Sequence, residues 1–114
     1  MARHWAETLA KDYLLSKNYT LLAENYAVRG GELDLIMQDE ETIVFAEVRQ
    51  RKTAQYGTAA ESITPTKLAR MQKTALHFLQ NQFERDDLPV RFDAVLISGT
   101  QEKHSLEHLE NILF

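Results

Sequence analysis

The chain has 114 residues, 44% of them hydrophobic, and contains no cysteine. This length suits one domain with a single core, and the missing cysteines exclude a disulfide-stapled fold. No apolar run is long enough for a membrane span or a secretion leader, so we expect a single cytoplasmic domain over residues 1–114 with no membrane partner.

The formal net charge of −4 argues against a general nucleic-acid binder, because neutralising phosphates needs a basic surface. The charge is nevertheless distributed unevenly. Between residues 48 and 83 the single acid Glu61 stands among these basic residues: Arg49, Arg51, Lys52, Lys67, Arg70 and Lys73. A basic block inside an acidic chain is a candidate binding face.

The first half of the chain alternates between helical and extended patterns. Apolar residues at helical spacing predict an amphipathic helix over residues 3–17. Strand-like segments follow, with a tight turn at Gly30-Gly31 and a polar turn at 39–41. The predicted strands cover residues 19–28, 31–37 and 42–49.

The second half begins with residues 50–63, where the periodic pattern is lost and a long loop is predicted. Thr64 and Pro65 are typical of a helix start, so we expect a second helix from there to about Phe83. Three helix-disfavouring residues then end it: Asp86, Asp87 and Pro89. Residues 90–97 predict a fourth strand, and the tail from residue 101 fits either a helix or a strand.

The order helix, three strands, helix, strand (α-β-β-β-α-β) predicts an α/β domain with a central mixed sheet flanked by helices. The first three strands should form an antiparallel meander. The second helix should be the crossover that returns the chain to the same sheet.

Acidic residues interrupt the two most strand-like segments. Alternation in a strand places Glu32, Asp34 and Ile36 on one face and Leu33, Leu35 and Met37 on the other. In the next strand the corresponding face carries Ile43, Phe45, Glu47, Arg49 and Arg51. If these strands pair through the turn at 39–41, Asp34 and Glu47 can lie side by side.

Two readings of this acidic pair remain open. Adjacent carboxylates repel and are costly to bury, and a divalent cation would remove both penalties. Oxygen ligands favour Mg²⁺ or Mn²⁺ over zinc, and Glu7 of the first helix could be a further ligand or a plain surface residue. The alternative is a cross-strand ion pair, Asp34 with Arg49 or Glu47 with Arg51.

A metal held by carboxylates beside basic residues suits phosphodiester hydrolysis, in which cations neutralise the phosphate. Lys67, Arg70 and Lys73 form a helical stripe that could be an ordinary solvated face. The absence of acids from residue 62 to residue 83 favours a nucleic-acid-binding face, to which Arg51 and Lys52 would add.

The sequence resembles a known family in the following motifs: Glu7 in the first helix, Asn25-Tyr26, Gly31-Glu-Leu-Asp-Leu-Ile36, Val44-Phe-Ala-Glu-Val-Arg-Gln-Arg51, Tyr56-Gly57, Lys67 and Arg91-Phe-Asp93. It is similar to the YraN family of small bacterial proteins over nearly the whole chain to about Ile97. The resemblance implies a restriction-endonuclease-like fold similar to archaeal Holliday junction resolvases, and a predicted endonuclease activity.

The nuclease superfamily has a signature of an aspartate, then an acid, a spacer and a lysine. The resemblance implies that Asp34 and Glu47 fill the acidic positions and that Glu7 is the helical glutamate of the resolvase-like branch. Arg49 stands where lysine is usual. Arginine stays protonated and cannot accept a proton from water, but it can stabilise developing negative charge.

The leading hypothesis is therefore a Mg²⁺- or Mn²⁺-dependent endonuclease acting on DNA, with branched DNA among the substrates considered. Its catalytic residues would be Asp34, Glu47, Arg49 and Glu7. The alternative is a weak or inactive nuclease-fold module that binds nucleic acid or a protein partner. Junctions, flaps, single strands and RNA all remain open as substrates, and a homodimer is expected only by analogy with resolvases that cut two strands.

Overall fold

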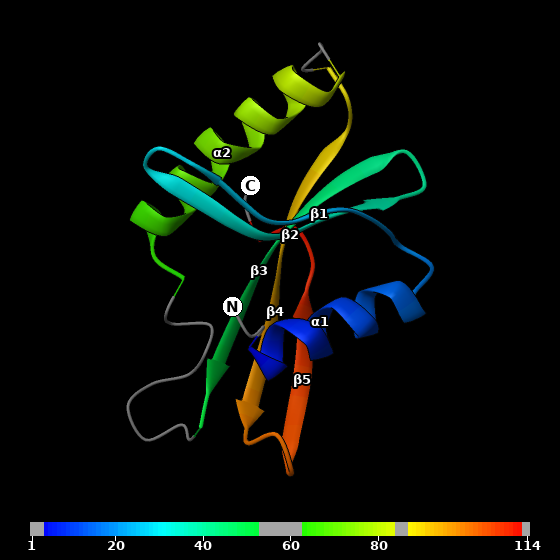
Figure 1. Ribbon diagram of the computed structural model, residues 1–114, viewed down its shortest axis with the longest axis vertical. Helices are drawn as coiled ribbons and strands as arrows, with labels where there is room; N and C mark the ends of the chain where they lie inside the picture. The colour runs from blue at the N-terminus through cyan, green and yellow to red at the C-terminus, as the bar shows by residue number, and fades with distance from the viewer. Residues whose placement is uncertain (1–3, 53–62, 84–86, 113–114) are drawn as a thin grey trace.

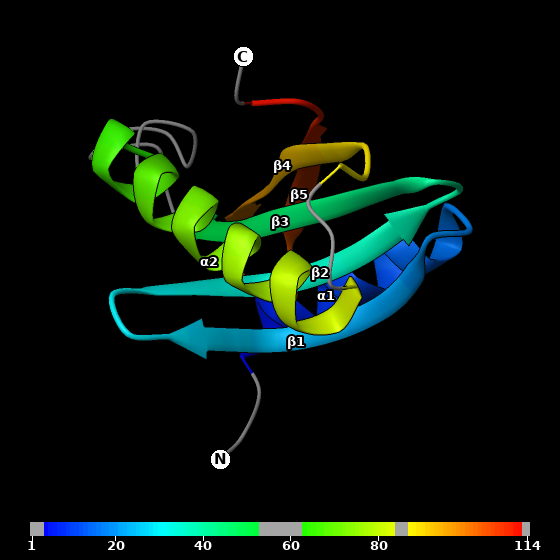
Figure 2. The ribbon, with the colours of Figure 1, turned by 90° about the horizontal axis from the view of Figure 1, so that it is seen from above.

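The computed structural model describes residues 4–52, 63–83 and 87–112, which form a five-stranded sheet with one helix on each face (Figures 1 and 2). The helices are α1 (Trp5–Ser16) and α2 (Pro65–Phe83). The strands are β1 (Thr20–Val28), β2 (Gly31–Asp39), β3 (Thr42–Arg51), β4 (Val90–Gly99) and β5 (His104–Leu109). Among these residues, no helix combines the length and apolar character needed to cross a membrane.

The strands lie in the order β1-β2-β3-β4-β5. β1, β2 and β3 pair in antiparallel fashion, which confirms the predicted meander. β3 and β4 are parallel, and parallel neighbours require a long crossover connection. The crossover contains α2, so the predicted mixed sheet and α/β fold class are confirmed.

The tail forms β5, which pairs antiparallel to β4 and adds a strand that the predicted order lacks. Leu106 and Leu109 are three residues apart, a spacing that also occurs on one face of a helix, so the pattern alone could not assign this segment. β3 continues to Arg51, two residues past its predicted end, because Gln50 and Arg51 pair with β4. Most of the predicted loop, residues 53–62, and the helix-ending Asp86 lie outside the described residues.

Two apolar clusters fill the spaces between the sheet and its helices. On the α1 side, the small residues Ala6 and Ala10 let the helix approach the sheet closely, and Leu14 packs beside them. On the α2 side, Met71 and Phe78 pack against the opposite face. β3 contributes to both clusters, so its residues alternate between the faces as predicted.

Strict alternation fails in β2, where Leu33 and Ile36 belong to the same α2-side cluster. The reason lies in β1, where Asn25 stands opposite Asp34 and has a left-handed backbone with φ of 49°. Asparagine tolerates this conformation better than most residues, and it occurs at the level of the sheet where the faces of β2 change. The prediction that Leu33 shares a face with Leu35 was therefore wrong, and Asp34 lies at the point of this change.

Candidate active site

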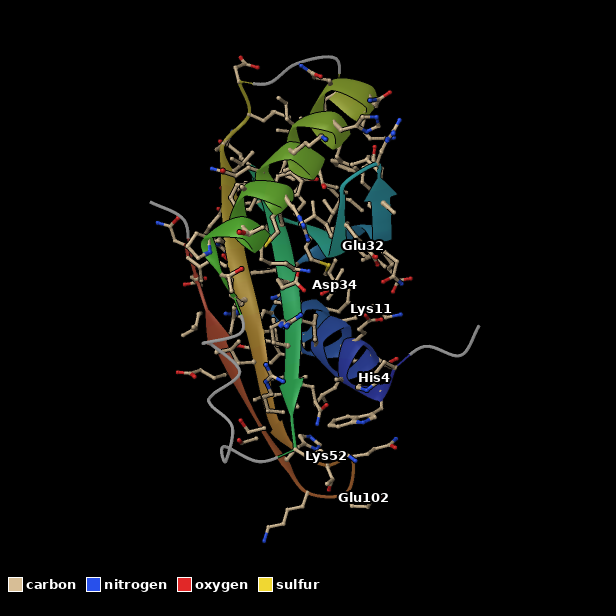
Figure 3. The ribbon with its side chains drawn as sticks, turned by 90° about the vertical axis from the view of Figure 1, so that its left-hand side faces the viewer. His4, Lys11, Glu32, Asp34, Lys52 and Glu102 are labelled. Atoms are coloured by element: carbon tan, nitrogen blue, oxygen red, sulfur yellow. The ribbon has the colours of Figure 1, made fainter. Side chains whose placement is uncertain are left out.

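Asp34 and Glu47 are neighbours at the point where β2 and β3 cease to pair. The ladder between these strands ends at Leu35, which lies opposite Ala46. Beyond this pair, Asp34 Oδ2 accepts a hydrogen bond from the backbone N–H of Val48 at 2.8 Å. The Asp34 carboxylate thus replaces a backbone acceptor, and Figure 3 shows it between α1 and α2.

Glu47 is the most unusual side chain of this pair because it is only 2% exposed. Its Oε1 faces Lys67 Nζ at 3.4 Å and Arg49 Nη1 at 3.8 Å. Its Oε2 is buried without a hydrogen-bond partner among the described residues. Burial, followed by the charge of Asp34 and a hydrogen bond with it, raises the pKa of Glu47 to about 8, although Lys67 opposes this shift.

A buried carboxyl with an unpartnered oxygen and a second carboxylate beside it is costly as it stands. A divalent cation would supply the missing partner to Oε2 and would remove the repulsion from Asp34. Both potential ligands are oxygen atoms, which Mg²⁺ and Mn²⁺ prefer. The donor set at this position therefore fits the expected cofactor.

The Lys67 Nζ lies closer to the Glu47 carboxyl than the Arg49 guanidinium does. The sequence suggested only a nucleic-acid-binding role for Lys67, because its place above Glu47 depends on how α2 crosses β3. The local signal was nevertheless present: Thr64 Oγ1 accepts a hydrogen bond from Lys67 N at 3.2 Å, which fixes Lys67 in the first turn of α2. α2 thus brings a lysine, Lys67, to the same Glu47 oxygen that Arg49 of β3 faces.

Glu7 lies in the first turn of α1 and is half-buried. α1 packs on the opposite face of the sheet from α2, which carries Lys67. The part of the chain that the structure describes contains one group of at least three ligand-type side chains with converging atoms, and Glu7 is not in it. Its expected role as a third ligand remains a prediction.

That group consists of Asp93, His108 and Glu110, whose ligand atoms lie within 4.8 Å of one another. Asp93 is completely buried. Its Oδ2 lies 2.8 Å from His108 Nε2, and its Oδ1 accepts a hydrogen bond from Asn111 N at 3.0 Å. Burial acts to raise the pKa of Asp93, but hydrogen bonds from His108, Arg91 and Asn111 outweigh it and lower the pKa.

Arg91 makes this second group a poor metal site. Its guanidinium binds both Asp93 oxygens, at 2.9 Å and 3.1 Å, and donates to Tyr19 Oη at 2.7 Å. It also forms ion pairs with Asp39 and Glu110, each at 3.4 Å. A metal ion would have to displace this fixed positive charge, so we interpret the group, which the sequence did not reveal, as a structural network.

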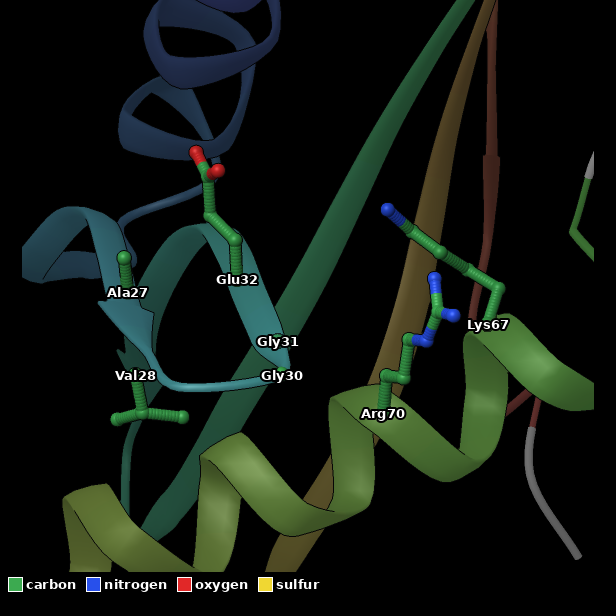
Figure 4. A pocket seen from close by; sticks show the side chains of 7 residues that line it. All are labelled: Ala27, Val28, Gly30, Gly31, Glu32, Lys67 and Arg70. Atoms are coloured by element: carbon green, nitrogen blue, oxygen red, sulfur yellow. The ribbon is translucent and has the colours of Figure 1, made fainter.

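A pocket of about 550 Å³ lies between the β1–β2 turn and the first half of α2 (Figure 4). Figure 4 shows Lys67 and Arg70 reaching from α2 toward this space, with Glu32 on the opposite wall. Gly31 permits the close approach of the two walls. A Cβ on Gly31 would collide with Thr74 Oγ1 and stand 2.9 Å from the backbone oxygen of Arg70.

The remaining predicted basic residues lie elsewhere. Arg51 and Lys52 are exposed at the end of β3, and Lys52 lines a separate hollow beside the β4–β5 turn. Figure 3 shows Lys52 on the side of Asp34 that faces away from α2. The structure therefore divides the basic block into two groups that flank the acidic pair.

Comparison with known proteins identifies the family. A sequence model of the Uncharacterised protein family UPF0102 matches residues 6–97, a range that includes the acidic pair, Lys67 and Asp93. A UPF0102 protein of Saccharophagus degradans is 44% identical over 116 residues, covering 97% of this chain and 95% of the relative. Further UPF0102 proteins, from Nitrosomonas europaea and Thermus thermophilus, are 46% and 45% identical; these matches cover 93% and 92% of this chain, and 87% and 90% of the relatives. The chain therefore belongs to the UPF0102 family, which confirms the resemblance to the YraN proteins.

Proposed function

We propose that this protein is a cytoplasmic, Mg²⁺-dependent endonuclease that hydrolyses phosphodiester bonds in DNA, including branched DNA. The observation that carries the proposal is the Glu47 carboxyl, buried beside Asp34 with one oxygen unpartnered. Burial of this kind is destabilising in a purely structural role and is useful where a cation binds. Manganese is expected to substitute for magnesium because both prefer oxygen ligands.

Asp34 and Glu47 would hold the cation, with Glu7 as the expected additional ligand from α1. When bound, the cation lowers the pKa of a coordinated water and neutralises charge on the phosphate. Asp34 is held in place by the Val48 N–H, so its other oxygen has a fixed direction. This rigidity is what a catalytic ligand requires.

Arg49 and Lys67 supply positive charge on the Glu47 side of the site, at 3.8 Å and 3.4 Å from Oε1. Arg49 can stabilise negative charge that develops on the phosphate but cannot exchange a proton. The ammonium group of Lys67 can do both. We propose that Lys67 contributes the function that a lysine on β3 serves elsewhere in the nuclease superfamily.

The direct test is cleavage of labelled four-way junction, flap, linear duplex and single-stranded DNA with Mg²⁺ or Mn²⁺. Glu47→Gln keeps the shape of the side chain but removes its charge, and it should reduce cleavage by roughly a hundredfold or more. Glu107→Gln makes the same change at an exposed position of β5 and is the matched control. Equal cleavage by wild type and Glu47→Gln would reveal a contaminating nuclease and contradict the proposal.

A second candidate function is a nuclease-fold module that binds nucleic acid or a protein partner with weak or no activity. The observation in its favour is that Lys67 and Arg49 already lie beside Glu47, so the site carries compensating charge without a cation. Calorimetric titration with Mg²⁺, read together with the cleavage assay, separates the two candidates. Mg²⁺ binding and cleavage that are both lost in Glu47→Gln support the enzyme, and nucleic-acid binding without cleavage supports the module.

A further inference from the structure

Two hollows lie along α2, and residues at the β1–β2 turn line both of them. The first is the pocket of about 550 Å³ described above, and the second measures about 360 Å³. Val28 lines both, so they meet at the turn. We call the two together the α2 groove.

The α2 groove is rich in positive charge. Lys67 and Arg70 line its first part, and Arg29 and Lys73 line its second part. α2 contains no acidic residue, and within the described part of the chain neither Arg70 nor Lys73 forms an ion pair. Glu32 is the acidic residue among the linings of these two hollows. The groove therefore attracts a polyanion.

Lys67 connects the groove to the acidic pair. Lys67 lines its first part and is also the residue whose Nζ lies 3.4 Å from Glu47 Oε1. Lys67, Arg70 and Lys73 follow at three-residue spacing and so share one side of the helix. From Lys67 to Gln80, α2 extends roughly 20 Å at its usual rise, which is long enough for a few nucleotides.

The second part of the groove also offers apolar surface. Leu76 is 46% exposed and lies beside Val28 and His77. The His77 ring is held in place by Tyr26, whose Oη lies 2.6 Å from His77 Nδ1. An apolar floor and a fixed ring among cations suit a nucleobase whose phosphates are held at the rim.

The groove favours a single strand over a duplex, because its apolar surface at Leu76 can contact the face of a base, which a duplex keeps stacked inside. Its walls are the β1–β2 hairpin and α2, which Gly31 allows to approach within contact of the Arg70 backbone.

We infer that the α2 groove binds an unpaired DNA strand and guides it to the Asp34–Glu47 pair. This inference rests on the proposed function, since it assigns the substrate class of the same site. It predicts preference for DNA with a single-stranded arm, such as a flap or tail, over blunt duplex. The phosphates would contact Lys67, Arg70 and Lys73, and a base would lie on Leu76.

Binding can be tested without cleavage, by fluorescence anisotropy in EDTA with a labelled thymidine oligonucleotide and a blunt duplex. Lys73→Ser should weaken single-strand binding by roughly fivefold and reduce its salt dependence by about one phosphate contact. Lys103→Ser, which removes the same charge at the β4–β5 turn, is the control. Leu76→Ser should also weaken binding, whereas Leu15→Ser, 41% exposed on α1, should not.

Tighter binding of the single strand, weakened by Lys73→Ser and Leu76→Ser but not by their controls, would support the inference. Equal affinity for duplex, or variants indistinguishable from their controls, would overturn it. The proposed function can fail separately. If the single strand binds as expected but no substrate is cut with Mg²⁺, the single-strand groove is supported and the nuclease proposal is wrong. If blunt duplex is cut equally well by Lys73→Ser and wild type, the nuclease proposal is supported and the groove inference is wrong.

Discussion

At the residue scale, Glu47 combines a poor environment for its charge with a good position for a cation. Its pKa is about 8, against an ordinary value of 4.5, because of burial and the adjacent Asp34. A carboxyl whose pKa is higher in the folded than in the unfolded state is harder to ionise when the protein is folded. Its cost to the fold therefore grows as pH rises above the unfolded pKa, and it stops growing above the folded pKa. The native charge at Glu47 therefore costs stability in the absence of a cation.

Glu47→Gln should raise the melting temperature by roughly 5 °C near pH 9 in EDTA, because the buried charge is gone. The same variant should lose the rise in melting temperature that Mg²⁺ gives to wild type. Thermal melts followed by circular dichroism at pH 5 and pH 9 check both statements, with Glu107→Gln as the control. A wild type that is more stable than Glu47→Gln in EDTA at pH 9 would contradict the assigned cost of burial.

Asp93 presents the opposite case, since its hydrogen bonds lower its pKa below the ordinary 3.8. A carboxyl with a depressed pKa stabilises the fold above its unfolded pKa, and this stability is lost as pH falls through the folded pKa. Asp93→Asn should therefore cost about 3 kcal/mol at neutral pH, because it leaves Arg91 without its buried partner.

Urea unfolding at pH 7 and near pH 3 measures this difference. The difference in unfolding free energy between wild type and Asp93→Asn should be smaller at the acidic pH, where the Asp93 carboxyl begins to protonate in the unfolded state. Asp12→Asn, an exposed position on α1, should change little at either pH. A gap that is constant with pH would mean that the charge of Asp93 contributes nothing.

At the scale of elements, the packing of the β1–β2 hairpin on α2 depends on Gly31. A methyl group there would meet Thr74 Oγ1 and the backbone oxygen of Arg70, and the backbone of a helix cannot easily move. Gly31→Ala should therefore destabilise the protein by about 2 kcal/mol and displace the hairpin that forms one wall of the α2 groove.

Gly30→Asn is the matched comparison. Gly30 has a φ of 90°, and its added Cβ would lie 3.3 Å from the flexible end of Lys73. Asparagine tolerates positive φ better than other residues with a Cβ, so this change should cost less than Gly31→Ala. Chemical denaturation ranks the two variants, and the reverse order would show that hairpin conformation matters more than its contact with α2.

At the scale of the whole molecule, the sequence predicted the elements well where one local rule decided the outcome. Thr64 and Pro65 mark the start of α2, and alternation marks β3. The adjacency of Asp34 and Glu47 also followed from the hairpin between β2 and β3, whereas the metal itself stays a prediction.

Features that join distant parts of the chain were not predictable in this way. The faces of β2 change opposite Asn25, whose left-handed backbone leaves no trace in the apolar pattern of β2. Lys67 reaches Glu47 only because α2 crosses β3 at that point. Arg91 and Tyr19 are 72 residues apart, and their contact depends on how the whole sheet is assembled.

The same long-range network predicts that β5 is essential, although the family match ends at residue 97. β5 pairs with β4, and the tail supplies His108 and Asn111 to the buried carboxylate of Asp93. Removing residues 101–114 would leave Asp93 partly unsatisfied and expose the edge of β4, which carries buried apolar residues. The shortened chain should lose cooperative unfolding in urea and become prone to aggregation.

The control is His104→Ala, which changes one exposed residue at the start of β5 and should unfold cooperatively like wild type. A shortened chain that unfolds cooperatively with wild-type stability would show that the sheet is complete without its last strand.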